Sequence, residues 1–241
     1  MKAIIDLPRL SNDPAAPFPP SSKALDSPNG LLAWGGDLRP ERLLTAYRSG
    51  IFPWYSQGQP ILWWNPAPRC VLYPEKVHLS RRTRRRYNSN VYHLTADSAF
   101  IEVVAGCAEP RGYECGTWIT QDMLDAYGQL HQLGHAHSLE VWEDELLVGG
   151  IYGLALGSVF FGESMFSRRT DASKIALVAL CRHLHRLGFG LLDCQVGNAH
   201  LYTMGCENIS RRHFEALLES LVNDPRPVGS WQDLCVFEKR W

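Results

Sequence analysis

The chain has 241 residues, of which 45% are hydrophobic and 20% are charged, and its formal net charge is -1. This balance excludes an intrinsically disordered chain and provides enough apolar side chains for one large domain or two unequal ones. Seven cysteines without a CxxC pair favour free thiols in a reducing cytoplasm, and no apolar run reaches the roughly 18 residues of a membrane span.

The first third of the chain is rich in turn-forming residues and aromatics. Proline, serine, asparagine and glycine dominate residues 8 to 40, which predicts an ordered loop. A short helix is expected from Pro40 to about Ser49, because proline is favoured at the first helical position. From Gly50 to Arg69, five large aromatic residues alternate with prolines and predict a rigid connector. We therefore expect a small N-terminal domain over residues 1–67 and a second domain over residues 68–241.

Longer periodic elements follow. Thr120 is predicted to cap a helix that ends at Gly134. His131, His135 and His137 do not predict a metal site, because that glycine prevents one helical face from holding all three. Residues 137–166 predict three antiparallel strands, with turns at 143–145 and near 156–158.

The last third alternates between helices and one strand. Asp171 is expected to cap a helix that runs from Ala172 to about Leu187 and stops at Gly188. A strand, LLDCQV (residues 191–196), a short helix and a helix from Arg211 to Val222 complete the order. Side chains alternate faces along a strand, so Asp193 and Gln195 should share one face, opposite Leu192, Cys194 and Val196.

This order, followed by NAHLYTMGC (residues 198–206), resembles the fold of GNAT acetyltransferases. The resemblance implies an α+β protein whose central, mostly antiparallel sheet is flanked by helices. An acetyl-CoA enzyme needs a glycine-rich turn at the helix start so that backbone N–H groups can approach the pyrophosphate. Here the turn is SRRTDASK, with Arg168 and Arg169 in place of glycine. The sequence thus argues against coenzyme A and leaves room for another acyl donor.

A basic cluster indicates what that donor is. HLSRRTRRRY contains five arginines within six residues, although the chain is nearly neutral overall. Such a cluster is typical of a phosphate-backbone contact, and a solvated helix face or loop is the alternative. Together with aromatic residues able to stack on an exposed base, the cluster favours an acyl donor carried on RNA, an aminoacyl-tRNA.

The motifs NGLLAWGGDL, AYRSGIFPWYS, PILWWNP, GTWIT, LGHAHSLEVW, LVGGIYG, FGESMFS, ASK and DCQV resemble those of the leucyl/phenylalanyl-tRNA-protein transferase family. The resemblance runs from about Asn29 to the helix after Asn198. It implies transfer of Leu, Phe or, less well, Met from tRNA to the N-terminal α-amine of proteins that begin with Arg or Lys, which marks them for degradation by the N-degron pathway. It implies no cofactor, no membrane contact and a monomer.

The same resemblance assigns the site residues. Asp193 and Gln195 are implied as the catalytic pair, with Gln195 aligning the attacking amine; the alternative is that they tie together a buried turn. Glu163 is implied as a partner of a substrate amino group, or it caps the next turn. Other substrate-binding positions are Ile151, Phe160, Leu177, Leu180 and Leu184 around the donor side chain, Tyr47, Trp54, Trp118 and Tyr127 around the terminal adenosine and aminoacyl group, and Asn198. Arg81, Arg84 and Arg85 are implied in tRNA binding, and Lys174 can meet a phosphate or be a surface lysine.

Two other functions fit part of the sequence. A CoA-dependent acetyltransferase would share the expected fold but needs the missing glycine turn. A non-catalytic RNA-binding module would keep the arginine cluster and the aromatics but has no need for Asp193, Gln195 and Glu163 together.

Overall fold

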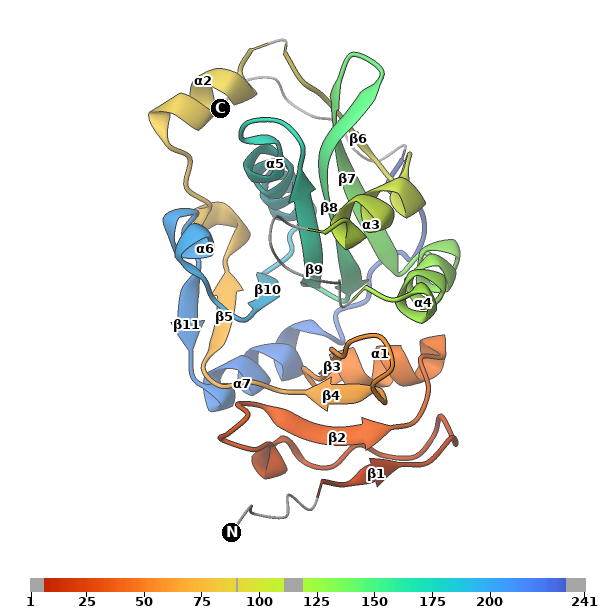
Figure 1. The fold of residues 1–241 in the computed structure, drawn as a ribbon. Coiled ribbons are helices and arrows are strands. Elements are labelled where there is room, and N and C mark those ends of the chain that lie inside the picture. The colour runs from red at the N-terminus through yellow and green to blue at the C-terminus, as the bar shows by residue number, and fades with distance from the viewer. Residues whose placement is uncertain (1–6, 90, 111–118, 233–241) are drawn as a thin grey trace.

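The computed structural model describes residues 7–89, 91–110 and 119–232. These residues form a small N-terminal sheet below a larger sheet that carries most of the helices (Figure 1). The predicted α+β class, with a separate N-terminal part and a mostly antiparallel central sheet, is confirmed. None of the helices in the described ranges is long and apolar enough to cross a bilayer.

The N-terminal sheet has the strand order β1-β2-β4-β3. Its elements are β1 (Arg9–Leu10), the 3-10 helix η1 (Ser21–Lys23), β2 (Leu31–Gly35), α1 (Pro40–Arg48), β3 (Phe52–Pro53) and β4 (Leu62–Trp64). Helix α1 starts at proline as predicted. The prediction that the segments on either side of α1 lack strands is wrong. Residues 8–40 contain β1 and β2, and residues 50–69 contain β3 and β4. These strands have two to five residues, which is too few for an alternation to be recognised in the sequence.

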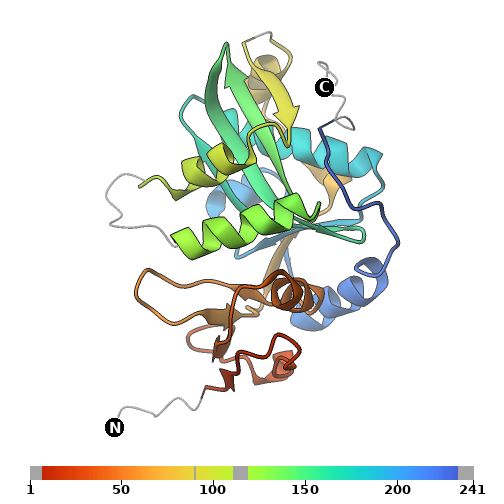
Figure 2. The same cartoon turned by 90° about the vertical axis from the view of Figure 1, so that its right-hand side faces the viewer.

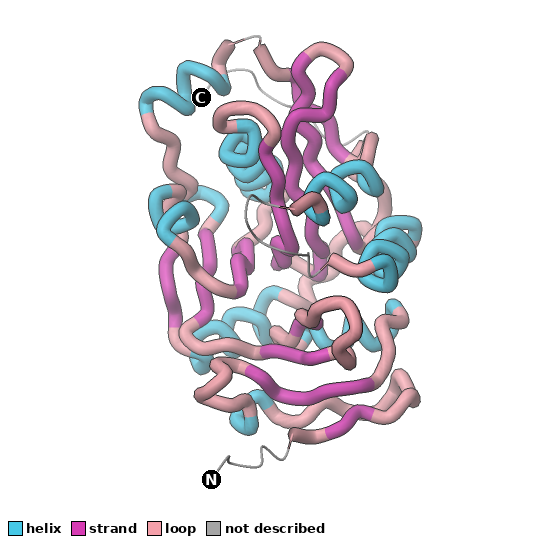
Figure 3. Tube along the Cα trace, in the orientation of Figure 1, coloured by secondary structure: helices cyan, strands magenta, loops and turns pink. Residues whose placement is uncertain are grey.

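The large sheet has the order β11-β5-β10-β9-β8-β7-β6. The pair β9–β10 is parallel, and the other described pairs are antiparallel. Figure 3 shows the strands of this sheet in magenta above those of the N-terminal sheet. The strands of the large sheet are β5 (Arg69–Leu72), β6 (His93–Ala96), β7 (Ala136–Glu143), β8 (Leu146–Leu156), β9 (Val159–Ser167), β10 (Leu191–Gln195) and β11 (Glu207–Ile209). The three predicted strands over residues 137–166 are confirmed as β7, β8 and β9. Gly157 turns the chain from β8 to β9 with a φ of 55°, and a Cβ there would lie 2.3 Å from the Leu221 carbonyl oxygen.

Helices cover both faces of this sheet. They are η2 (Pro74–Lys76, a 3-10 helix), α2 (Arg81–Tyr87), α3 (Phe100–Ala108), α4 (Gln121–Gln132), α5 (Ala172–Arg186), α6 (Ala199–Thr203) and α7 (Arg211–Leu221). Figure 2 shows α3 and α4 on one face and α5 on the other. Thr120 caps α4 by accepting a hydrogen bond from the Met123 N–H at 3.3 Å, as predicted. Asp171 precedes α5 but does not cap it with its side chain; its carboxylate instead accepts a hydrogen bond from Lys174 at 3.1 Å.

The apolar core does not stop at the predicted domain boundary. One cluster of buried residues joins Leu43 and Trp63 of the N-terminal part to Val103, Tyr127 and Phe214 of the second part. Helix α7 lies against the N-terminal part, where Ser21 donates a hydrogen bond to Glu215. The two parts therefore share one continuous core, and the seam between them is where the cavity described next is found.

Candidate active site

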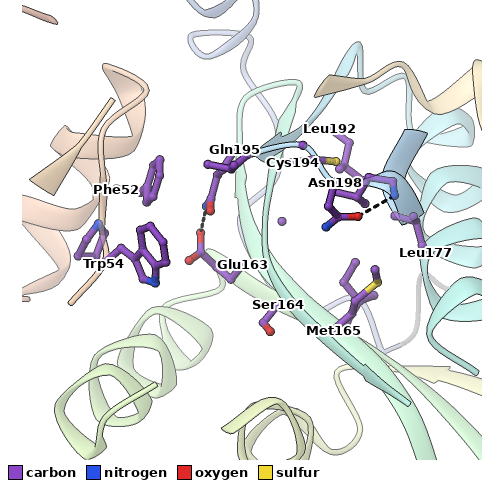
Figure 4. Close-up of a pocket in the computed structure, with 16 residues that line it drawn as sticks. Phe52, Trp54, Glu163, Ser164, Met165, Leu177, Leu192, Cys194, Gln195 and Asn198 are labelled. Atoms are coloured by element: carbon purple, nitrogen blue, oxygen red, sulfur yellow. Dashed lines mark hydrogen bonds between the residues drawn. The ribbon is translucent and has the colours of Figure 1, made fainter. Parts of the chain in front are cut away.

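A cavity of about 400 Å³ lies where β3 of the N-terminal part meets β9 and β10 of the large sheet. Figure 4 shows Phe52 and Trp54 on one side, Met165 and Leu177 on the other, and Glu163 and Gln195 between them. A space of this size holds a small ligand. The lining residues are Phe52, Pro53, Trp54, Ile151, Gly162, Glu163, Ser164, Met165, Leu177, Leu192, Cys194, Gln195, Val196, Gly197, Asn198 and Leu201.

Glu163 is the centre of the polar contacts in this cavity. Tyr47 donates a hydrogen bond to its Oε1 at 2.6 Å, and Tyr127 donates to its Oε2 at 3.0 Å. The two tyrosine hydroxyl oxygens are also within hydrogen-bond distance of each other. Each hydroxyl has one proton, so a tyrosine that donates to the other tyrosine does not donate to Glu163 at the same time. Gln195 donates from Nε2 to Glu163 Oε1 at 3.1 Å, so the Gln195 carbonyl oxygen is the end of that amide left for a substrate donor.

Burial sets the protonation of this network. It raises the pKa of Glu163 to about 7, a shift that the tyrosine hydrogen bonds oppose. Burial also raises the pKa of Tyr47 and Tyr127 well above the usual tyrosine value, so both hydroxyls stay protonated and act as donors. Glu163 is therefore a carboxyl group that changes charge near neutral pH, next to two tyrosine hydroxyls that stay protonated.

Strand β10 does not alternate as predicted. Gln195 has a φ of 60°, and a β-bulge separates it from Asp193. As a result Leu192, Cys194 and Gln195 all line the cavity. Asp193 lies in the interior with an exposure of 0%, where Arg69 donates to its two carboxylate oxygens at 2.8 and 2.7 Å. The prediction of a shared face for Asp193 and Gln195 is wrong, because a left-handed residue resets the period of two.

The predicted walls of the donor pocket divide into two groups. Ile151 and Leu177 line the cavity. The other three, Phe160, Leu180 and Leu184, are at most 1% exposed and belong to the core behind it. Met165, Leu192 and Leu201 take their places in the lining. An apolar residue on α5 packs into core or cavity by the same hydrophobic preference, so its sequence position did not distinguish the two.

The aromatic residues predicted near the terminal adenosine are also placed differently from one another. Trp54 lines the cavity and is 45% exposed, so its ring is open to a base. Tyr47 and Tyr127 are fully buried and reach the cavity only through Glu163, which leaves no ring face for stacking. Trp118 lies outside the described residues.

The predicted substrate-binding residue Asn198 and the basic residues predicted for tRNA lie around and beyond the cavity. Asn198 lines it, and its Oδ1 accepts a hydrogen bond from the Leu201 N–H at the start of α6. Lys174 forms an ion pair with Asp171 at 3.1 Å. On α2, which is capped by Ser80 and stands apart from the sheet (Figure 1), the exposed arginines include all three predicted for tRNA, Arg81, Arg84 and Arg85.

The histidines near α4 serve the structure. His131 hydrogen-bonds the Ala136 carbonyl at 2.8 Å, and His137 hydrogen-bonds the Asp97 carboxylate at 2.9 Å. Within residues 7–89, 91–110 and 119–232, no group of three or more His, Cys, Asp or Glu residues is arranged to hold a metal ion.

Sequence reasoning missed Phe52, Cys194 and Arg69 as residues at or next to this site. Phe52 comes from a two-residue strand with no periodic signal. Cys194 lies on the same face of β10 as Leu192 and lines the cavity with it, and its sulfur lies 3.7 Å from that of Cys206. Arg69 was only the end of the aromatic connector. The sequence contains one indication of its role: Arg69 begins a run of apolar strand residues, so its side chain is expected to be buried. A buried arginine requires an acidic partner.

The family model described as leucyl/phenylalanyl-tRNA protein transferase matches residues 71–219, and the model of that family's N-terminal domain matches residues 36–67. The chain belongs to the leucyl/phenylalanyl-tRNA-protein transferase family. The curated leucyl/phenylalanyl-tRNA-protein transferase of Stutzerimonas stutzeri is 56% identical over 89% of this chain and 95% of its own length. Those of Nitrosomonas eutropha and of Xanthomonas campestris pv. campestris strain B100 are each 54% identical, over 89% and 92% of this chain and 92% and 90% of their own lengths. Membership of this family makes the chain a transferase.

Solved structures give a weaker likeness. A GCN5-related N-acetyltransferase from Kribbella flavida is 10% identical with a TM-score of 0.37, covering 71% of this chain and 61% of its own. The structure of L-PGS from Bacillus licheniformis is 10% identical with a TM-score of 0.38, covering 78% and 64%. At these TM-scores the likeness carries no weight for the function of this leucyl/phenylalanyl-tRNA-protein transferase family member.

Proposed function

We propose that this protein transfers Leu, Phe or, less well, Met from aminoacyl-tRNA to the N-terminal α-amine of proteins that begin with Arg or Lys. The observation that carries this proposal is the hydrogen-bonded pair Glu163 and Gln195 at the centre of a cavity with one aromatic and one aliphatic side. The aliphatic side suits an apolar aminoacyl side chain. The aromatic side, with its exposed Trp54, suits the terminal base of a tRNA.

The chemistry asks for alignment more than for a strong base. An aminoacyl-tRNA is an activated ester, and an α-amine with a pKa of about 7.7 to 8.0 is neutral in roughly a tenth of molecules near pH 7. Holding amine and ester together can supply roughly 7 to 11 kcal/mol, whereas a positioned base adds about two to four decades in rate. In this proposal the Gln195 carbonyl oxygen accepts a hydrogen bond from the attacking amine, and Glu163 pairs with a substrate ammonium group.

The donor's remaining contacts follow from its chemistry. Ile151 and Leu177 contact the aminoacyl side chain, and a pocket of this kind separates side chains that differ by one methylene by only about 1 to 3 kcal/mol. This small difference supports acceptance of several apolar amino acids, with β-branched Val and Ile excluded by shape. Exposed Arg81, Arg84 and Arg85 contact phosphates without reading bases. Lys174 is less available to a phosphate, because its ammonium group already forms an ion pair with Asp171.

The cellular setting is also part of the proposal. The protein works as a monomer in the cytoplasm, where aminoacyl-tRNA is made, and its products enter the N-degron pathway. The free thiols among the described cysteines are compatible with that compartment. No cofactor takes part, since the ester bond of the donor already carries the energy for peptide-bond formation.

The test is transfer of labelled Leu from Leu-tRNA to three peptides, which begin with Arg, with Ala, or with Arg whose α-amine is acetylated. Label on the free Arg peptide alone supports both the reaction and the acceptor rule. Label on none of them while Leu-tRNA still binds would leave an RNA-binding module without catalysis. Thermal stabilisation by acetyl-CoA would instead revive an acetyltransferase.

A further inference from the structure

Arg69 is a completely buried cation next to the cavity, and its contacts are specific. It is the first residue of β5 and has an exposure of 0%. Its Nε and Nη2 donate to the Oδ1 and Oδ2 of Asp193 at 2.8 and 2.7 Å. Its guanidinium lies 5.0 Å from the ring centre of Phe52 and 4.5 Å from that of Phe214. A forked, two-bond pair fixes both the distance and the plane of the carboxylate.

The carboxylate that Arg69 fixes in turn holds the backbone of Gln195. Asp193 Oδ1 accepts a third hydrogen bond, from the Gln195 N–H at 2.9 Å. Gln195 has a φ of 60°, a conformation that residues with a Cβ rarely adopt unless their surroundings impose it. The Asp193 bond stabilises this bend, and the bend places the Gln195 amide beside Glu163.

The same contacts leave Asp193 no route to a substrate. Its carboxylate is directed to Arg69 and to the Gln195 backbone, and the residue has an exposure of 0% and does not line the cavity. Phe52, by contrast, lines the cavity and also contacts the Arg69 guanidinium. The buried ion pair thus lies directly behind the wall that carries Gln195.

We propose that Arg69 is a positioning residue for the transfer reaction. Its two hydrogen bonds fix the Asp193 carboxylate, and this carboxylate stabilises the backbone bend at Gln195. The bend directs the side-chain amide of Gln195 into the cavity. This inference rests on the proposed function in which Gln195 aligns the attacking amine. It assigns Asp193 a positioning role as well, exerted through the Gln195 backbone, and excludes contact between Asp193 and either substrate.

Two variants test this: Arg69→Met, and the double variant that combines Arg69→Met with Asp193→Asn. Arg69→Met leaves a buried carboxylate without its partner, so we expect a kcat per folded protein at least 30-fold below wild type, with the Kd for Leu-tRNA changed less than threefold. The double variant has no buried charge left unpaired. The amide introduced by Asp193→Asn also keeps an oxygen that can accept the hydrogen bond from the Gln195 N–H. We therefore expect the kcat of the double variant to recover to within about fivefold of wild type.

The matched control is Arg42→Met. Arg42 is also an arginine with 0% exposure and an acidic neighbour, Asp37 at 3.5 Å, but it does not line the cavity. We expect this variant to lower the melting temperature and leave kcat per folded protein unchanged. A wild-type kcat in folded Arg69→Met would overturn the proposal, because Arg69 would then serve stability alone.

The double variant also shows whether the reaction needs the negative charge of Asp193 or only the hydrogen bond that residue 193 accepts from the Gln195 N–H. If its kcat stays more than about fivefold below wild type, the negative charge of Asp193 is itself required and the proposal is wrong; this holds even where Arg69→Met does not fold. Hydrogen exchange of the Gln195 backbone N–H, which is bonded to Asp193, can be measured without any transfer reaction. It should be faster in Arg69→Met and near wild type in the double variant, and no change in either would also overturn the proposal. Absence of Leu transfer by the wild-type protein would refute the proposed function instead.

Discussion

Replacing Glu163 by glutamine should remove a pH dependence that the wild-type protein carries near neutrality. The pKa of Glu163 is raised to about 7 by burial, so its ionised fraction rises from roughly one tenth at pH 6 to roughly nine tenths at pH 8. If the carboxylate pairs with a substrate ammonium, ionisation of Glu163 alone should raise the wild-type kcat/KM for Leu-tRNA about ninefold between pH 6 and pH 8. The amide introduced by Glu163→Gln has nearly the same shape as the carboxyl group and never ionises.

The assay is the initial rate of Leu transfer at limiting Leu-tRNA between pH 6 and 8, with both proteins run in parallel. Substrate amines titrate in the same range and contribute equally to both proteins, so the ratio of wild-type to variant kcat/KM isolates Glu163. We expect that ratio to rise about ninefold with a midpoint near pH 7. A ratio that is flat across the interval would refute the role given to this carboxylate.

The same variant has a stability signature of known sign. Because burial raises the pKa of Glu163 in the folded protein above its value of 4.5 in the unfolded chain, its protonated form favours folding. That contribution is fully present below about pH 4.5 and is lost as pH rises through about 7. Thermal melts should therefore show the wild-type melting temperature falling relative to that of Glu163→Gln between pH 4.5 and 8. The opposite trend would mean that Glu163 is ionised at low pH.

Three further outcomes are expected. Gln195→Ala should lower kcat roughly 100-fold and leave the Kd for Leu-tRNA within threefold, whereas lost binding at normal turnover would contradict its aligning role. Replacing Arg81, Arg84 and Arg85 by Ala should flatten the slope of log K against log salt by about one unit for each lost phosphate contact; an unchanged slope would place tRNA elsewhere. Ile151→Ala should enlarge the aliphatic side and raise Phe transfer relative to Leu roughly tenfold in direct competition, and an unchanged ratio would remove Ile151 from the donor pocket.

Features of the fold with a local cause were predictable from sequence. Thr120 caps a helix because its hydroxyl lies next to free N–H groups, and Gly134 and Gly188 end helices because each has a positive φ. The strands β7, β8 and β9 follow one another with short turns, so their pairing needs no distant partner. Asp193, Gln195 and Glu163 were singled out by family resemblance, whereas their geometry was not predicted.

The rest depended on contacts between segments far apart in the chain. Strand β1 pairs in parallel with β2, as Arg9 with Trp34, and nothing near Arg9 in the chain predicts that partner. The left-handed φ of Gln195 could not be predicted, because the residue at this position is neither glycine nor asparagine. Arg69 and Asp193 are 124 positions apart, and nothing near either residue in the chain identifies the other as its partner. Burial of both is what makes them a pair, and burial is a property of the assembled fold.

Helix α7 is made late in synthesis yet completes the earliest part of the chain. Phe214 lies against Arg69 and within 2.6 Å of where a Cβ on Gly50 would be, and Glu215 accepts a hydrogen bond from Ser21. Folding usually proceeds from the N-terminus as a chain leaves the ribosome. Here the N-terminal segment emerges without its last packing partner, so the surface that packs against Phe214 stays uncovered until α7, which ends at Leu221, has been made. A nascent chain stalled before α7 should therefore be a client for chaperones.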